Sequence, residues 1–433
     1  MIQQQAVGKG LIVLLVAVAV VVLAAGGAMA ASITHAVDPE HGAAYITYVT
    51  NKAKEFYQET GHQVNIINVS GQRTQIAVWA AANSLPDAVD VVSDNAYSYF
   101  EQGMFADLRP YFSRPAAGSR VLDDFLPLSL VAFTAPEKSS SPGAIFAYPW
   151  NVLHFIGAYN TELMARSGLT PPNELGEEWN WETMRQYAGK LSVQAAQVSQ
   201  KRYGIQIPKV WHRWGVYFRH AGNPIFNRDI DPDQVNLNTT AALNTLRFLV
   251  SMREEEHLTW DNWVFNQGQA AISFNANPNF ALTMKNYNIT IDFIPFAYGP
   301  DGANGVEVQA AGVAMNKKTT NPDLVWQWLN YLWGDYEHIV EFIETTSRIP
   351  VLKRAQTDFL NISKSWAPHA HLIIEGLAGK GTGLRPVVRA GGVVGIVENW
   401  IHQAMDLKVM PADALYQAHH LANEALKEDW ARR

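Results

Sequence analysis

Residues 62–92 of the 433-residue chain read HQVNIINVSGQRTQIAVWAAANSLPDAVDVV and contain the pattern that decides the fold class. Residues 62–69 alternate apolar and polar side chains and are rich in β-branched residues, which predicts a strand. Residues 72–82 carry apolar side chains at helical spacing, and residues 88–92 form the short apolar run of a buried strand. Strand, helix and strand in this order predict a parallel sheet covered by helices, so the chain is of the α/β class.

The same alternation continues on both sides of this segment. Upstream, residues 32–37 are predicted to form a strand and residues 45–60 a helix that stops at Gly61. Downstream, the pattern predicts a strand at 155–159 and helices starting at 97 and spanning 162–167, 181–191, 239–256, 322–334 and 411–430. In open sheets of this class, ligands bind beyond the carboxyl ends of the strands.

The first 30 residues have the composition of an export signal. Lys9 is the sole charged residue among them, an apolar run covers residues 11–25, and Ala28-Met29-Ala30 offers small side chains for cleavage. We therefore predict a signal peptide over residues 1–30 and a periplasmic location. The alternative is an uncleaved membrane anchor, because residues 11–31 are just long enough to span a bilayer.

The composition of the chain excludes several function classes. Hydrophobic residues make up 48% of the chain and charged residues 17%, so a chain of this length is expected to bury the cores of two domains. The net charge is −7 and no Lys/Arg cluster occurs, which argues against a nucleic-acid partner. The chain has no cysteine, which removes thiolate catalysis, cysteine-ligated metal sites and a lipid anchor on an N-terminal cysteine.

Sequence motifs of catalysis are also lacking. The chain has no Gly-x-Ser-x-Gly elbow, no His-Glu-x-x-His helix and no Walker loop. His369 and His371 could bind a metal ion, but no set of carboxylates accompanies them, so we expect a surface position and no metal or cofactor. The acidic run 254–256 is typical of a solvated face and not of a positioned acid/base pair. We expect a protein that is not an enzyme.

Six segments, taken in order, resemble a single protein family. They are SLPDAVDVVSDNAYSYFEQGMFADLRPYF (84–112), AIFAYPWNVLHFIGAYNTELMARSGL (144–169), WNWETMRQYAGKL (179–191), FNQGQAAISFNANPNFAL (265–282), AAGVAMNKKTTNPDLVWQWLNYLW (310–333) and SRIPVLKRA (347–355). They are distributed along the chain from residue 84 to residue 355. The chain resembles the extracellular solute-binding proteins of ABC importers, in the sugar-binding family that includes maltose-binding protein.

The resemblance implies a periplasmic-binding-protein-like fold, with two discontinuous α/β lobes joined by a hinge that closes over a ligand. The implied N-terminal lobe comprises residues 31–148 plus 266–317, and the implied C-terminal lobe residues 149–265 plus 318–433. The chain would cross between them near Pro149 and again at 314–318. The implied partners are a small-molecule ligand, with a sugar preferred, and the transmembrane permease subunits of an ABC importer. The membrane would be reached only through the permease or an uncleaved N-terminus.

A sugar site combines aromatic platforms with amide and charged side chains, and this chain contains 14 tryptophans. The resemblance places residues 211–214 in a loop at the cleft, while other candidates follow predicted strands or the predicted crossing. The candidate ligand-binding residues are Asp94, Asn95, Trp150, Asn151, Trp211, His212, Arg213, Trp214, Asn275, Asn277, Gly312, Arg348 and Arg385.

These candidates and their ligand have alternatives. Trp211 and Trp214 could equally pack inside a lobe, Asp94 could cap a helix, and Arg348 could pair with Glu341 or Glu344. Asn275 and Asn277 could be turn residues before Pro278. The ligand could instead be a polyamine, an iron chelate or a phosphorylated polyol, and the same aromatic cleft could belong to a secreted glycosidase. Trp, Asn and Gln outnumber acidic groups in the candidate loops, which favours a neutral sugar.

Overall fold

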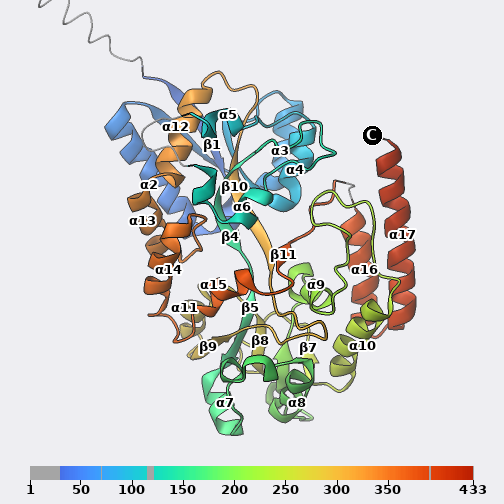
Figure 1. Ribbon diagram of the computed structural model, residues 1–433. Helices are drawn as coiled ribbons and strands as arrows, with labels where there is room; N and C mark the ends of the chain where they lie inside the picture. Colours follow the sequence, from blue (N-terminus) through green and yellow to red (C-terminus); the bar gives the residue numbers. More distant parts are fainter. Residues whose placement is uncertain (1–29, 70, 115–120, 390–391, 433) are drawn as a thin grey trace, which may run out of the picture.

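The computed structural model describes residues 30–69, 71–114, 121–389 and 392–432 (Figure 1). It consists of two α/β lobes, each built on one β-sheet with helices around it. The predicted fold class is therefore confirmed. Residues 1–29, which make up nearly all of the predicted signal peptide, lie outside the described residues. Among the described residues, none of the helices combines the length and the apolar composition that a bilayer crossing requires.

The first lobe contains a six-stranded sheet in which the strands follow the order β11-β10-β3-β1-β2, with β4 paired to β10. Its strands are β1 (Ser32–Val37), β2 (Gln63–Asn68), β3 (Ala88–Val92), β4 (Tyr148–Leu153), β10 (Glu307–Met315) and β11 (Gly383–Leu384). β1 runs parallel to β2 and β3, whereas β10 is antiparallel to β3 and β4. The three strands predicted at 32–37, 62–69 and 88–92 thus lie side by side in one sheet.

The helices of the first lobe come from both halves of the chain. They are α2 (Ala43–Thr60), α3 (Gln72–Ala81), α4 (Ser93–Glu101), α5 (Arg109–Phe112), α6 (Pro127–Val131), α12 (Pro322–Trp333), α13 (Tyr336–Thr346) and α14 (Gln356–Ser363). The ring of Tyr48 in α2 packs against Trp333 of α12 at 5.6 Å and against Phe342 of α13 at 5.4 Å between centroids. The predicted boundary, which gave residues 318–433 to the C-terminal lobe, is therefore corrected for α12 and α13.

The second lobe contains a five-stranded sheet in the order β7-β6-β8-β5-β9. Its strands are β5 (Ile156–Asn160), β6 (Tyr203–Gln206), β7 (Leu258–Thr259), β8 (Ala270–Ala276) and β9 (Ile291–Ile294). β8 lies between β6 and β5, where Ile272 and Phe274 are fully buried. The prediction that residues 266–317 belong to the N-terminal lobe is thus wrong for β8 and β9, because both strands pair with β5.

The helices of the second lobe include the two long helices at the end of the chain. They are α7 (Thr161–Ser167), α8 (Trp181–Leu191), α9 (Trp211–His220), α10 (Thr240–Glu254), α11 (Phe280–Lys285), α15 (Leu372–Glu375), α16 (Val393–Met405) and α17 (Pro411–Ala431). α16 and α17 lie side by side along this lobe (Figure 1). The helices predicted at 162–167, 181–191, 239–256 and 411–430 are present with bounds shifted by at most two residues.

The first two passages of the chain between the lobes lie next to each other, and the chain crosses again between α14 and α15 and on either side of β11. It first leaves the first sheet at the end of β4, and residues 154–155 lead into β5 of the second sheet. It returns through residues 295–306, between β9 and β10. The second predicted crossing, at 314–318, is therefore wrong, because residues 314 and 315 already pair with β3 inside the first sheet. β4 and β10 are hydrogen-bonded to each other from Leu153 and Gln309 onward, so the two crossings are adjacent.

Candidate ligand-binding site

A cavity of about 360 Å³ lies where the two lobes meet, and we call it the hinge cavity. The first lobe contributes Glu40 and His41, from the turn between β1 and α2, together with Asn151 of β4 and Arg348, which follows α13. The second lobe contributes Asn277, directly after β8. Three sequence-predicted site residues, Asn151, Asn277 and Arg348, are thus brought together around one space.

A second cavity of about 210 Å³ also joins elements of both lobes, and we call it the Asp94 cavity. Its lining includes Asp94 at the start of α4, Trp211 at the start of α9, and Arg385 just after β11. Pro386, Val388, Gly392 and Val394 complete the lining. Asp94, Trp211 and Arg385 were all predicted as site residues from the sequence.

Asp94 is held by two partners. Its Oδ2 lies 3.2 Å from Nη1 of Arg385, and its Oδ1 accepts a hydrogen bond from Nε2 of Gln309 at 3.1 Å. The N-cap of α4 is Val92, without a side-chain cap, so Asp94 does not play the capping role considered above. The neighbouring Asn95 has a buried Oδ1 that finds no hydrogen-bond partner among the described residues.

The two tryptophans at the start of α9 have different roles. Trp211 lines the Asp94 cavity, and its Nε1 donates to Oε1 of Glu307 at 3.2 Å. Trp214 is fully buried and packs against Trp211 and Phe218, and against His402 of α16. The structure therefore places Trp214 in the core of the lobe, which corrects its prediction as a ligand contact.

Between these two tryptophans, His212 and Arg213 lie against the crossing from β4 to β5. The Arg213 guanidinium carbon lies 3.2 Å from the ring centroid of Phe155, and its Nε donates to Oδ1 of Asn275 at 2.8 Å. Burial lowers the pKa of Arg213 to about 9, and repulsion from Arg385 acts in the same direction. Burial, followed by the charges of Arg213 and Arg385, holds the pKa of His212 well below its usual value, so its imidazole is neutral.

Trp150 is a packing residue and not a platform for a ligand. Its ring is fully buried, stacked at 4.4 Å on Tyr45 and at 5.2 Å on Trp333. The prediction that Trp150 contacts ligand is corrected accordingly. Arg348 passes 5.7 Å from the Trp150 ring, and its Nη2 donates to the backbone oxygen of His41 at 2.7 Å. Burial lowers the pKa of Arg348.

Gly312 has a structural role in the first sheet. A Cβ at this position would lie 2.9 Å from both the Phe133 ring and the backbone oxygen of Tyr148. The register between β10 and β4 also shifts between Ala311 and Gly312. Close strand approach therefore requires glycine here, and Gly312 is not in the lining of either interlobe cavity, so its contact with ligand stays a prediction.

Sequence reasoning missed several residues of the interlobe region. Glu40 and His41 follow β1 at its carboxyl end, so the rule that singled out Asp94 could have found them. Arg389 links Tyr97 of α4 to Asp231 of the second lobe. Its Nη2 lies 2.5 Å from the Tyr97 hydroxyl and 3.1 Å from Oδ2 of Asp231. No local pattern marks these three residues, because they are far apart in the sequence.

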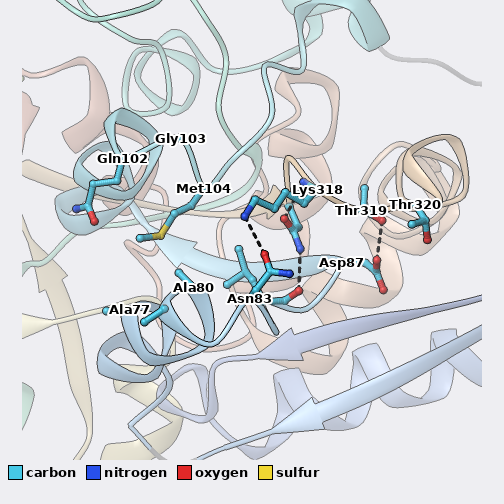
Figure 2. Close-up of a pocket in the computed structure, with 13 residues that line it drawn as sticks. Ala77, Ala80, Asn83, Asp87, Gln102, Gly103, Met104, Lys318, Thr319 and Thr320 are labelled. Carbon is cyan, nitrogen blue, oxygen red and sulfur yellow. Dashed lines mark hydrogen bonds between the residues drawn. The ribbon is translucent and has the colours of Figure 1, made fainter.

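A further cavity of about 600 Å³ lies on the first lobe, away from the other two (Figure 2). Asp87, which precedes β3, lines it, whereas Asp94 follows β3, so the two cavities lie at opposite ends of that strand. Figure 2 shows Lys318 directed to Asn83 and Thr319 to Asp87, with hydrogen bonds of 2.8 and 2.6 Å. This cavity is therefore separate from the junction of the lobes.

The described residues do not contain a group of three or more His, Cys, Asp or Glu side chains placed to hold a metal ion. His369, considered above as a possible metal ligand, has its Nδ1 2.6 Å from Oδ2 of the buried Asp292.

Two α/β lobes joined by adjacent crossings, with cavities lined by polar side chains at their junction, define the class of two-lobed solute receptors. Residues 39–335 match the model of the bacterial extracellular solute-binding protein family, and the chain belongs to this family. It is a solute-binding protein and not an enzyme. The family is extracellular, which agrees with the predicted export. No curated protein matches the sequence.

Several solved structures share the fold along almost their whole length. An ABC substrate-binding protein from Listeria monocytogenes, in complex with cycloalternan, has a TM-score of 0.76 at 17% identity, over 92% of this chain and 99% of that chain. A cyclic α-maltosyl-1,6-maltose binding protein from Arthrobacter globiformis has a TM-score of 0.74 at 17% identity, over 93% and 100%. The GacH receptor of Streptomyces glaucescens, solved unliganded and with acarbose, has a TM-score of 0.73 at 14% identity, over 92% and 99%. At these identities the likeness shows the fold.

Proposed function

We propose that this protein is the substrate-binding component of an ABC importer and captures a saccharide between its lobes. The observation that carries the proposal is the hinge cavity, where Glu40, Asn151 and Arg348 of the first lobe meet Asn277 of the second. A ligand held there contacts both lobes at once, so binding favours the conformation in which they are close together. The buried Oδ1 of Asn277 has no hydrogen-bond partner among the described residues, and a ligand hydroxyl would satisfy it.

The saccharide class is supported by the polar groups around the two cavities and by the relatives. Amide and charged side chains suit sugar hydroxyls, and the buried Trp211 ring adds an apolar wall to the Asp94 cavity. The structurally similar receptors were solved with cycloalternan, acarbose and maltotetraose. The proposed contacts are Asn151, Asn277 and Arg348 in the hinge cavity and Asp94, Trp211 and Arg385 in the Asp94 cavity.

The proposal includes the route of the solute. The protein is exported by cleavage of residues 1–30, closes over its ligand in the periplasm, and presents the closed form to the permease. Contacts between Tyr97 of the first lobe and Asp231 of the second support such a closed form, because they hold the lobes together away from the hinge.

A thermal-shift screen tests the proposed ligand class, because a solute that binds only the native state raises the melting temperature by mass action. We expect a shift of several degrees with at least one mono- or oligosaccharide, and no shift with spermidine or an iron chelate. Arg348→Gln should abolish the shift, whereas Arg166→Gln, an exposed position on α7, should preserve it. Shifts confined to polyamines or iron chelates would contradict the proposal.

A further inference from the structure

We propose that the ligand of this receptor carries an anionic group, a carboxylate or a phosphate, and that Arg213 binds it. The inference rests on the proposed function, because it assigns a chemical class to the solute of the same interlobe site. It differs from the neutral sugar that the sequence favours. Acidic sugars and phosphorylated sugars or polyols are the ligands that it predicts.

The hydrogen bonding of Arg213 carries the argument. Its Nε donates to the neutral Oδ1 of Asn275, and its guanidinium lies over the Phe155 ring. Neither terminal nitrogen has a hydrogen-bond acceptor among the described residues, and Arg213 forms none of their ion pairs. The two terminal nitrogens form the fork that binds a carboxylate or a phosphate in bidentate fashion.

The other arginines around the Asp94 cavity are paired with acids. Arg385 lies 3.2 Å from Asp94, Arg389 lies 3.0 Å from Glu101, and Arg219 lies 2.5 Å from Asp229. These acids are therefore engaged elsewhere and do not compensate the charge of Arg213. Glu307 is also engaged, by the Trp211 indole and by Nε of Arg219.

An uncompensated guanidinium in this environment is costly. Burial lowers the pKa of Arg213 to about 9, so the group is still charged at neutral pH although it is only partly exposed to water. The nearby Arg385 adds repulsion. A ligand anion would supply the missing counter-charge and would gain a charge-assisted hydrogen bond in a poorly hydrated site.

Arg213 is not in the lining of either cavity, but it interacts with residues next to both. Asn275, its hydrogen-bond partner, stands two residues before Asn277 of the hinge cavity. Arg385, whose charge acts on Arg213, lines the Asp94 cavity. Arg213 is partly exposed, so a ligand can reach it.

The test compares matched neutral and acidic probes at constant ionic strength. Calorimetry would measure the affinities of glucose, glucuronate and glucose 6-phosphate, and of maltose and maltobionate, with sulfate as an anion control. We expect an acidic member to bind at least about tenfold more tightly than its neutral parent, and less tightly as salt rises. Tighter binding of glucuronate or maltobionate would identify the anionic group as a carboxylate, and tighter binding of glucose 6-phosphate would identify it as a phosphate. Sulfate binding as tightly as every acidic probe would reduce Arg213 to a general anion site and overturn the proposal.

Two variants link the preference to Arg213. Arg213→Gln should abolish the tenfold ratio between the acidic probe and its neutral parent, while Arg166→Gln should leave both affinities unchanged. Asn275→Asp keeps the shape of the side chain but places a carboxylate beside Nε of Arg213, so it should also remove the preference. If Arg213→Gln fails to fold, Asn275→Asp tests the proposal in its place.

The outcomes separate this inference from the proposed function. Neutral probes that bind as tightly as their acidic partners would overturn the anionic ligand and leave the saccharide receptor intact. The same holds if both variants retain the wild-type preference. If no probe binds and a saccharide screen is also silent, the proposed function fails, and the inference fails with it.

Discussion

The indole N–H of Trp211 donates a hydrogen bond to Oε1 of Glu307 at 3.2 Å, and both side chains are buried. Trp211 begins α9 of the second lobe, and Glu307 begins β10, the strand that enters the first lobe. The bond therefore attaches the aromatic residue of the Asp94 cavity to one of the two crossings. The second oxygen of Glu307 has no hydrogen-bond partner within the described part of the chain.

Glu307 is expected to make the protein less stable at higher pH. Burial raises the pKa of Glu307 to about 7, so the folded state holds a proton that the unfolded state releases near pH 4.5. The stabilisation from this proton is complete below pH 4.5 and is lost as the pH rises through 7. From pH 5 to pH 8 the loss is about 2 kcal/mol in the free energy of unfolding. Denaturant titrations of wild type and Glu307→Gln at both pH values measure it. An unchanged pH slope in the variant would contradict the raised pKa.

His154 is expected to act in the opposite direction. It is fully buried beside the crossing from β4 to β5, and burial lowers its pKa to about 4. Between pH 6.5 and pH 4, His154 binds a proton in the unfolded state but not in the folded state, so the free energy of unfolding falls as the pH falls. The expected loss from pH 7.5 to pH 5 is about 2 kcal/mol. Denaturation of His154→Leu should show a loss smaller by that amount. His220, whose pKa burial also lowers to about 4, keeps its own contribution in the variant.

Replacement of Trp150 should damage the fold and not only ligand binding. Its ring is stacked between Tyr45 and Trp333, so Trp150→Ala leaves a large cavity and should cost about 3–5 kcal/mol in the free energy of unfolding. Trp150→Phe keeps part of the stack and should cost less. Chemical denaturation followed by tryptophan fluorescence measures both. A Trp150→Ala protein of normal stability that had lost only its ligand affinity would restore Trp150 as a binding residue.

The contact between Tyr97 and Arg389 should favour the closed form. The Tyr97 hydroxyl lies 2.5 Å from Nη2 of Arg389 and 3.4 Å from Oδ2 of Asp231. Tyr97→Phe removes both hydrogen bonds and should weaken ligand affinity by about 1–2 kcal/mol. Calorimetry gives the affinity, and small-angle scattering gives the degree of closure. Tyr416→Phe, at an exposed position on α17, is the matched control. Equal ligand affinities of Tyr97→Phe and Tyr416→Phe would show that this contact does not contribute to closure of the lobes.

Local patterns predicted the individual elements well. The apolar spacing of 181–191 and 322–334 appears as α8 and α12 because each helix buries one face against its own lobe. The assignment of β8 to a lobe failed, because strand order depends on pairing between segments more than a hundred residues apart. β8 is inserted between β5 and β6, and its apolar sequence would suit a buried strand in either of the two sheets.

The candidate site was partly predictable for a related reason. Asp94 and Asn277 follow strands, so topology alone directs them to the junction of the lobes. Trp150 and Trp211 look alike in sequence, yet one is stacked in the first-lobe core and the other lines a cavity. The alternative considered for Arg348, an ion pair with Glu341 or Glu344, is not found: Arg348 donates to the backbone of His41, while Glu341 forms an ion pair with Lys52 of α2. These choices depend on packing between helices that are distant in the chain.

The pairing of β4 with β10 has a consequence for the unliganded protein. Because β4 and β10 are hydrogen-bonded up to the point where the chain leads into the second lobe, and later segments also join the lobes, the lobes can rotate about few axes and reach few open arrangements. Little conformational entropy is then lost when a solute draws them together. Most of the interaction free energy at the junction remains available to retain the captured molecule, and small solutes with few polar groups can still be held tightly.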